Sequence, residues 1–200
     1  MNKSNQTNKN EFITIVSGLP RSGTSMMMRM LQAGGMDILT DNIRTPNEDN
    51  PLGYFEIENV KKLKDGEYGW LSDAEGKAIK VISTLLENLP DQYKYKVIFM
   101  CRDIDEVLAS QKQMLVRRNE PVNNINDDEL GQVFKKHLIQ VEHWLDEQRN
   151  FEVVYVDYKD VINNTKSNLM KLRQNLDIKL DIESMLSVPD QGLYRQRKTN

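Results

Sequence analysis

The chain has 200 residues, a formal net charge of −3 and a hydrophobic fraction of 38%. This length allows one domain with a sizeable apolar core, and the small negative charge excludes a surface built as a whole for nucleic acid. The single cysteine, Cys101, excludes an internal disulfide and a zinc site made of cysteines.

The ends of the chain are polar and carry no targeting pattern. Residues 1–10 are predicted to be a disordered tail, and they lack the apolar stretch of a secretory signal. No apolar run reaches the length of a membrane span. Together with the low cysteine content, this leads us to expect a cytoplasmic protein with a single domain at 11–200.

Strand-like and helix-like segments alternate along the chain. The sequence first predicts a strand at 12–17, a helix from about Ser22 to the Gly34–Gly35 pair, and a polar loop at 36–75 with a helical turn near 56–64. Two strands follow at 77–82 and 95–101, and then two helices at 103–118 and 127–149. The last predicted elements are a strand at 151–158 and short helices at 165–176 and 181–186. Such alternation predicts an α/β fold, with a mostly parallel central sheet flanked by helices as in P-loop NTPases. Ligands of these folds bind outside the carboxyl ends of the strands.

The segment GLPRSGTS, at 18–25, follows the first predicted strand. Gly18 and Gly23 have the spacing of the P-loop G-x-x-x-x-G-K-[ST], but Thr24 occupies the lysine position. Glycines still allow backbone amides at a helix N-terminus to approach an anion, and Arg21 adds a cation. The loop therefore suits an anion that is less highly charged than a metal-bound triphosphate.

The sequence P-R-S-G-T-S resembles the 5′-phosphosulfate loop of the sulfotransferase superfamily. This resemblance implies 3′-phosphoadenosine-5′-phosphosulfate (PAPS) as the sulfonyl donor, 3′-phosphoadenosine-5′-phosphate (PAP) as the product, and no metal. By the same resemblance, the loop residues that bind the 5′-phosphosulfate are Pro20, Arg21, Ser22, Gly23, Thr24 and Ser25.

A second anchor is expected where the strand at 95–101 ends. Members of the superfamily bind the 3′-phosphate through an arginine at a strand end and a serine eight residues later. Arg102 and Ser110 fit this pattern. The alternative is that Arg102 forms ion pairs with nearby Asp103, Asp105 or Glu106.

The catalytic residues are harder to transfer from the resemblance. Many superfamily members place a histidine base two residues after a lysine; here the lysine is Lys80, but the histidine position is Ile82. Glu56, in a segment that resembles an N-P-x-G-Y-F-E element of bacterial relatives, is the candidate base, and the alternative is an acid at the start of a helix. Lys80 and Arg21 are the candidate cations for the transferred group.

Several further polar residues admit two interpretations. Arg195 and Arg197 resemble a basic C-terminal segment that caps the nucleotide, and a solvated tail is the alternative. His137 and His143 are six positions apart on a predicted helix, so they cannot form a metal pair, and we interpret them as structural or surface residues. Residues 157–158 resemble a superfamily segment that is mainly structural.

These observations predict a sulfotransferase that moves a sulfonyl group from PAPS to a hydroxyl or amine. The acceptor is expected to be a small molecule or carbohydrate bound near 36–75 and 117–128, and neither nucleic acid nor a membrane span is expected. Two alternatives remain: a divergent P-loop kinase or NTPase, and a non-catalytic module that binds PAPS or another nucleotide.

Overall fold

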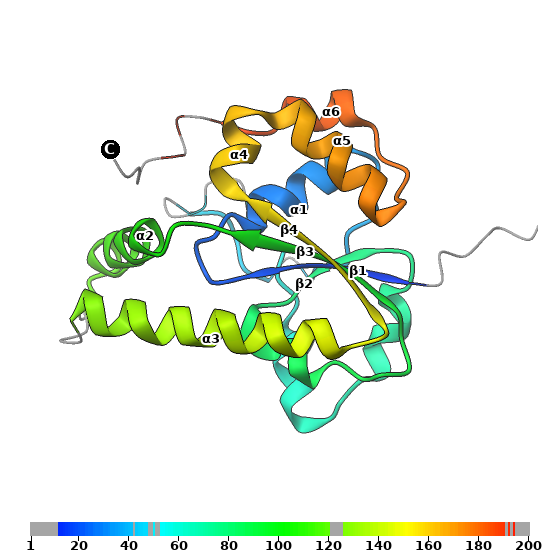
Figure 1. The fold of residues 1–200 in the computed structure, drawn as a ribbon, viewed down its shortest axis with the longest axis horizontal. Helices are drawn as coiled ribbons and strands as arrows, with labels where there is room; N and C mark the ends of the chain where they lie inside the picture. The colour runs from blue at the N-terminus through cyan, green and yellow to red at the C-terminus, as the bar shows by residue number, and fades with distance from the viewer. Residues whose placement is uncertain are drawn as a thin grey trace, which may run out of the picture.

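The computed structural model describes residues 12–41, 43–47, 50, 53–120, 126–190, 192 and 194. Within these residues lies a four-stranded sheet in the order β2-β1-β3-β4, and every pairing is parallel (Figure 1). Its strands are β1 (Ile13–Gly18), β2 (Ala78–Lys80), β3 (Tyr95–Cys101) and β4 (Phe151–Asp157). The expected α/β fold with a parallel central sheet is confirmed.

The helices of the described residues also follow the sequence pattern. The α-helices are α1 (Thr24–Ala33), α2 (Ile104–Arg117), α3 (Asp127–Glu147), α4 (Tyr158–Asn163), α5 (Thr165–Leu176) and α6 (Ile182–Leu186). The 3₁₀ segments are η1 (Glu58–Asp65), η2 (Gly69–Ala74) and η3 (Ser83–Asn88). The helical turn expected near 56–64 appears as η1, whereas α4, η2 and η3 were not predicted.

Strands β1, β2 and β3 are buried on both faces of the sheet, and the edge strand β4 is partly exposed. Successive side chains of β3 alternate between two apolar clusters, with Val97 and Phe99 in one and Ile98 and Met100 in the other. Helices α1, α4, α5 and α6 cover the face that carries Ile98 and Met100, and α3 with the 3₁₀ segments covers the face that carries Val97 and Phe99 (Figure 1). Burial on both faces explains why the strands have continuous apolar sequences instead of an alternating pattern.

The strand order creates a switch point between β1 and β3. The chain leaves β1 toward β2 on one side of the sheet and leaves β3 toward β4 on the other. Gly18, the last residue of β1, is in register with Met100 of β3. The loop after β1 and the turn after β3 therefore face each other across the crevice where ligands of such sheets bind.

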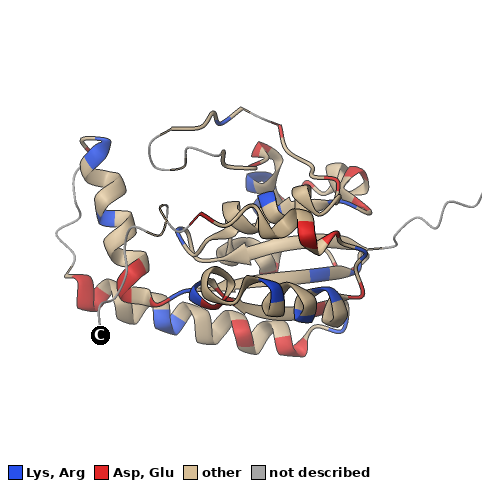
Figure 2. Ribbon diagram, turned by 90° about the horizontal axis from the view of Figure 1, so that it is seen from above, with Lys and Arg blue, Asp and Glu red and all other residues tan. Residues whose placement is uncertain are grey.

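Charged residues are distributed over the elements without strong segregation. Figure 2 shows basic and acidic positions mixed along α3 and across the other helices. Among the described residues, no helix combines the length and the apolar character needed to cross a membrane.

Candidate active site

The loop between β1 and α1 has the backbone of an anion-binding turn. Gly18, Arg21 and Gly23 have φ angles of 137°, 72° and 100°, and a non-glycine residue in the left-handed region is a strained position typical of functional loops. Gly23 is the N-cap residue of α1, and no side-chain hydrogen bond caps that helix. The first amides of α1, with the positive end of the helix dipole, are thus available to an anion.

Two neighbours fix the shape of this loop. The buried hydroxyl of Ser22 donates a hydrogen bond of 2.7 Å to the carbonyl oxygen of Leu19, and the Ser22 amide donates to the same oxygen at 3.2 Å. The polar groups of Ser22, a predicted ligand, are therefore used within the turn. A Cβ atom on Gly23 would lie 2.4 Å from a ring atom of Tyr158, so the ring of Tyr158 requires glycine there.

Arg102, the predicted second anchor, lies directly against this loop. Its Nη1 donates a hydrogen bond of 3.0 Å to the backbone carbonyl of Arg21, and its guanidinium stacks 4.7 Å from the ring centroid of Tyr158. Ser110, two turns into α2, accepts a hydrogen bond of 3.0 Å from Nε of Arg21. The two anchors that the sequence predicted separately are therefore in contact.

The alternative partner considered for Arg102 is present as well. Nε of Arg102 pairs with a carboxylate oxygen of Glu106 at 3.0 Å, and both side chains are almost fully buried. The other oxygen of Glu106 accepts a hydrogen bond of 2.7 Å from the hydroxyl of Tyr194. Burial, followed by this bond to the Glu106 carboxylate, raises the pKa of Tyr194 to about 12, so its hydroxyl remains a donor. Arg195 and Arg197 lie outside the described residues.

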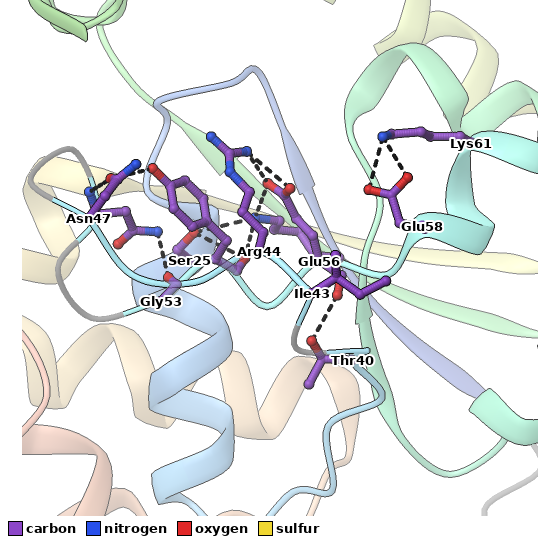
Figure 3. A network of polar contacts seen from close by, with 12 residues as sticks. Ser25, Thr40, Ile43, Arg44, Asn47, Gly53, Glu56, Glu58 and Lys61 are labelled. Atoms are coloured by element: carbon purple, nitrogen blue, oxygen red, sulfur yellow. Dashed lines mark hydrogen bonds and ion pairs between the residues drawn. The ribbon is translucent and has the colours of Figure 1, made fainter. Parts of the chain in front are cut away.

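Lys80 and Glu56, two predicted catalytic residues, form a second polar cluster beside α1. Nζ of Lys80 lies 3.1 Å from Glu56, 3.4 Å from the hydroxyl of Ser25 and within hydrogen-bond distance of the carbonyl of Tyr54. Nη1 of Arg44 contacts both carboxylate oxygens of Glu56, at 3.1 and 3.0 Å. Figure 3 shows Arg44 and Glu56 facing each other, with Ser25 alongside at the start of α1.

Opposing effects set the ionisation of this cluster. Partial burial acts to raise the pKa of Glu56, but the attraction of Lys80 and the hydrogen bonds from Arg44 and Lys80 outweigh it, so the pKa lies below its ordinary value. Burial lowers the pKa of Lys80, and Glu56 only partly opposes this effect. Glu56 therefore stays ionised near neutral pH, and its negative charge helps Lys80 to keep its proton.

A cavity of about 830 Å³ joins the two clusters. Its described lining includes Pro20, Arg21, Gly23, Thr24, Ser25, Lys80, Arg102 and Ser110, together with Glu56. The cationic lining residues are Arg21, Arg29, Arg44, Lys80, Arg102, Arg117 and Arg118, against the acids Glu56 and Asp190. This excess of cations, next to an uncapped helix N-terminus, fits a ligand that carries several negative charges.

Some cavity residues were not expected from their sequence pattern. Arg44 was not proposed as a site residue, although it lies in the segment 36–75 that was expected near the acceptor. Tyr158 was interpreted as structural. His137 lines the cavity as well, whereas His143 is exposed and lies near Glu147. These residues come from a loop, α4 and α3, and only the tertiary fold brings them to the strand ends. Among the described residues, no group of three or more His, Cys, Asp or Glu side chains could hold a metal ion.

The fold and the site define an α/β protein with a cation-lined cavity at the carboxyl ends of its parallel strands. The family model of the sulfotransferase domain matches residues 13–200, and the chain therefore belongs to this family. No curated protein sequence matches the chain.

Solved structures share the fold at low sequence identity. The sulfotransferase domain from the curacin biosynthetic pathway aligns with a TM-score of 0.53 and 17% identity, over 91% of this chain and 79% of its own. The sulfotransferase domain of the Synechococcus PCC 7002 olefin synthase aligns with a TM-score of 0.52 and 13% identity, and the alignment covers 96% of this chain and 82% of that domain. Sulfotransferase STF9 from Mycobacterium avium aligns with a TM-score of 0.54 and 12% identity, and the alignment covers 94% of this chain and 69% of STF9.

Proposed function

We propose that this chain is a PAPS-dependent sulfotransferase, with one domain at 11–200, that acts on a hydroxyl or amine of a small-molecule or carbohydrate acceptor. The observation that carries the proposal is the contact between the two predicted anion anchors. The Arg102 guanidinium bonds to the backbone of Arg21, and the Arg21 guanidinium bonds to Ser110. One ligand with phosphate groups at both ends of an adenosine is the natural occupant of such a site, and membership in the sulfotransferase domain family supports it.

The donor site divides into two parts. When bound, PAPS supplies the sulfonyl group and a phosphate as its leaving group. The amides at the start of α1, with Arg21 and the hydroxyls of Thr24 and Ser25, would hold the 5′-phosphosulfate. Arg102 and Ser110 would hold the 3′-phosphate, with Glu106 keeping the guanidinium in place.

Lys80 is proposed as the cation that stabilises the leaving phosphate. Its ammonium is buried and lies 3.4 Å from the Ser25 hydroxyl, beside the proposed position of the 5′-phosphosulfate. A preorganised cation in a dry site stabilises developing charge more than it would in water. Glu56 and Arg44 orient this group. The expected role of Glu56 as a base stays a prediction, and its two ion pairs and lowered pKa weigh against it.

The proposal is tested by incubating the chain with PAPS in the presence of a chelator. The acceptors are a phenol, an amine and a sugar, and PAP and sulfonated products are separated by chromatography. We expect PAP to form with at least one acceptor and to form much more slowly with a Lys80→Met variant. In a parallel assay without chelator, ADP formation from Mg-ATP, together with no PAP formation from PAPS, would instead indicate a P-loop NTPase. PAP binding without turnover of any acceptor would indicate a non-catalytic module.

A further inference from the structure

The cavity extends past Lys80 to an apolar wall. Ile82 lies there with 39% of its surface exposed, and Met114 of α2 joins it. Val133 and Phe134 of α3 complete the wall. An exposed patch of large apolar side chains inside a cavity indicates a binding surface. Because the other end of the cavity carries the cations of the proposed donor site, the apolar end is the place for the acceptor.

His137 is a polar residue at this apolar end. It lies three positions after Phe134 and four after Val133, so the three side chains share one face of α3. Nε2 of its ring is 2.8 Å from the hydroxyl of Ser83, which is fully buried. The hydrogen bond to Ser83 fixes the orientation of the imidazole, and Nδ1 is the remaining nitrogen that can meet a ligand.

The chain near Ser83 places this ring beside the segment that follows Lys80, in the same cavity. The amide of Val81 bonds to the carbonyl of Val16, so strand pairing continues past the end of β2. Side chains alternate along an extended chain, and Lys80 and Ile82 accordingly both line the cavity while Val81 is buried. Ser83 begins η3, which packs against α3. His137 thus approaches the cavity wall next to Ile82, an aliphatic residue that cannot accept a proton.

Glu56 is less suited to accept a proton than His137. Its carboxylate is held by Lys80 and Arg44, and proton transfer to it would weaken both ion pairs. The histidine imidazole, whose ring nitrogen can accept a proton, is the side chain most used for such transfers.

We propose that His137 is the catalytic base of this chain, an inference that rests on the proposed sulfotransferase function. In the transfer, the acceptor oxygen forms a bond to sulfur, and the bond between sulfur and the 5′-phosphate oxygen breaks with its electron pair remaining on the phosphate. The acceptor proton passes to Nδ1 of His137. The acceptor class that fits is a hydroxyl on an apolar body, bound against Ile82 and Phe134.

Ser83 acts in this scheme as a positioning residue. If its oxygen accepts a hydrogen bond from the Nε2 proton of His137, the neutral ring keeps its lone pair on Nδ1. The same hydrogen bond remains when the ring becomes protonated, because both nitrogens are then donors. Replacing Ser83 by alanine should therefore change the tautomer of His137 without removing the ring from the cavity.

The test combines nitrogen NMR of the full chain with turnover of PAPS, using 2-naphthol as the aryl alcohol probe. In the free protein we expect His137 to carry its proton on Nε2, and in Ser83→Ala to lose that preference. Adding 2-naphthol to the PAP-bound protein should shift the His137 signals and leave those of His143 unchanged. Turnover should fall by about 100- to 10,000-fold in His137→Gln, with the affinity for PAP unchanged, and should stay normal in the matched control His143→Gln.

The outcomes separate this inference from the proposed function. If wild type binds PAP and turns over PAPS, and His137→Gln does so at the same rate, His137 is not the base although the chain is a sulfotransferase. A free-state proton on Nδ1, or His137 signals that do not respond to 2-naphthol, would also overturn the inference. Failure of wild type to bind PAP would instead remove the proposed function itself.

Discussion

Nε of Arg21 donates a hydrogen bond of 3.0 Å to the hydroxyl of Ser110, a residue 89 positions further along the chain. The bond joins the loop after β1 to helix α2, which starts two residues after Arg102. Arg102 in turn binds the carbonyl of Arg21 at 3.0 Å. These two hydrogen bonds make a single polar unit out of the two predicted phosphate anchors.

Replacing Ser110 by alanine tests this unit at little structural risk. We expect the affinity for PAP to fall by about fivefold, because one hydrogen bond contributes about 1 kcal/mol. Calorimetry with PAP measures the change, and Ser72→Ala, an exposed serine on η2, is the control. Equal affinities in wild type and both variants would show that Ser110 has no part in binding.

Gly23 offers a sharper test of the loop. An alanine there would combine a φ of 100° with a contact of 2.4 Å to Tyr158, and we expect the Gly23→Ala variant to lose measurable PAP binding. Gly35→Ala is the matched control, since Gly35 has a φ of 88° but no atom within 4 Å of the added Cβ. It should lower the free energy of unfolding by about 1 kcal/mol and bind PAP normally. Normal PAP binding by Gly23→Ala would contradict the proposed loop.

The strands and the turn at 18–25 could be predicted from the sequence because their signals are local. An apolar run such as that of β3 and a loop such as 18–25 are contiguous in the sequence. Arg102 was proposed through its resemblance to the strand-end arginine of the sulfotransferase superfamily, and the parallel order of the strands explains why it lies at the same edge of the sheet as this loop. Arg44 and Tyr158 carry no comparable local signal. Tyr158 is in the site because α4 returns the chain against Gly23.

The interpretation of His137 shows the limit of sequence reasoning more clearly. The sequence indicates that His137 and His143 lie on different faces of one helix. It does not indicate which face meets the cavity, because that depends on the packing of α3 against η3. The 3₁₀ segments η2 and η3 were missed for a related reason: they are short, and tertiary packing stabilises them more than their own sequence does.

The ionisation of Lys80 gives a prediction for pH. Burial lowers its pKa in the free protein, so the ammonium loses its proton at a lower pH than an ordinary lysine. A bound anion favours the charged form, so PAP binding raises this pKa and takes up protons at alkaline pH. Affinity should therefore begin to fall at a lower pH than it would with a lysine of ordinary pKa.

Calorimetry in buffers with different enthalpies of ionisation measures that proton uptake. A Lys80→Met variant should bind more weakly and show no uptake, whereas Lys80→Arg should keep its charge and bind over a wider alkaline range. Proton uptake that is the same in Lys80→Met and wild type would assign it to another group.

Cys101 is predicted to react slowly. Burial raises the pKa of its thiol to about 11, so little thiolate exists at neutral pH. Labelling with iodoacetamide at pH 7.5 should be much slower in the native protein than in the unfolded chain, as followed by mass spectrometry. Equal rates in both states would show that the end of β3 is open to solvent.

The most direct test of the central claim is a calorimetric titration of the chain with PAP in the presence of a chelator, compared with adenosine 5′-phosphate. We predict one site with a dissociation constant on the order of micromolar for PAP. The 3′-phosphate should add at least about tenfold in affinity through charge-assisted hydrogen bonds, and Arg102→Lys should reduce that gain. No binding of PAP, or equal affinity for the two nucleotides, would contradict the claim that the two anchors hold one bisphosphorylated adenosine.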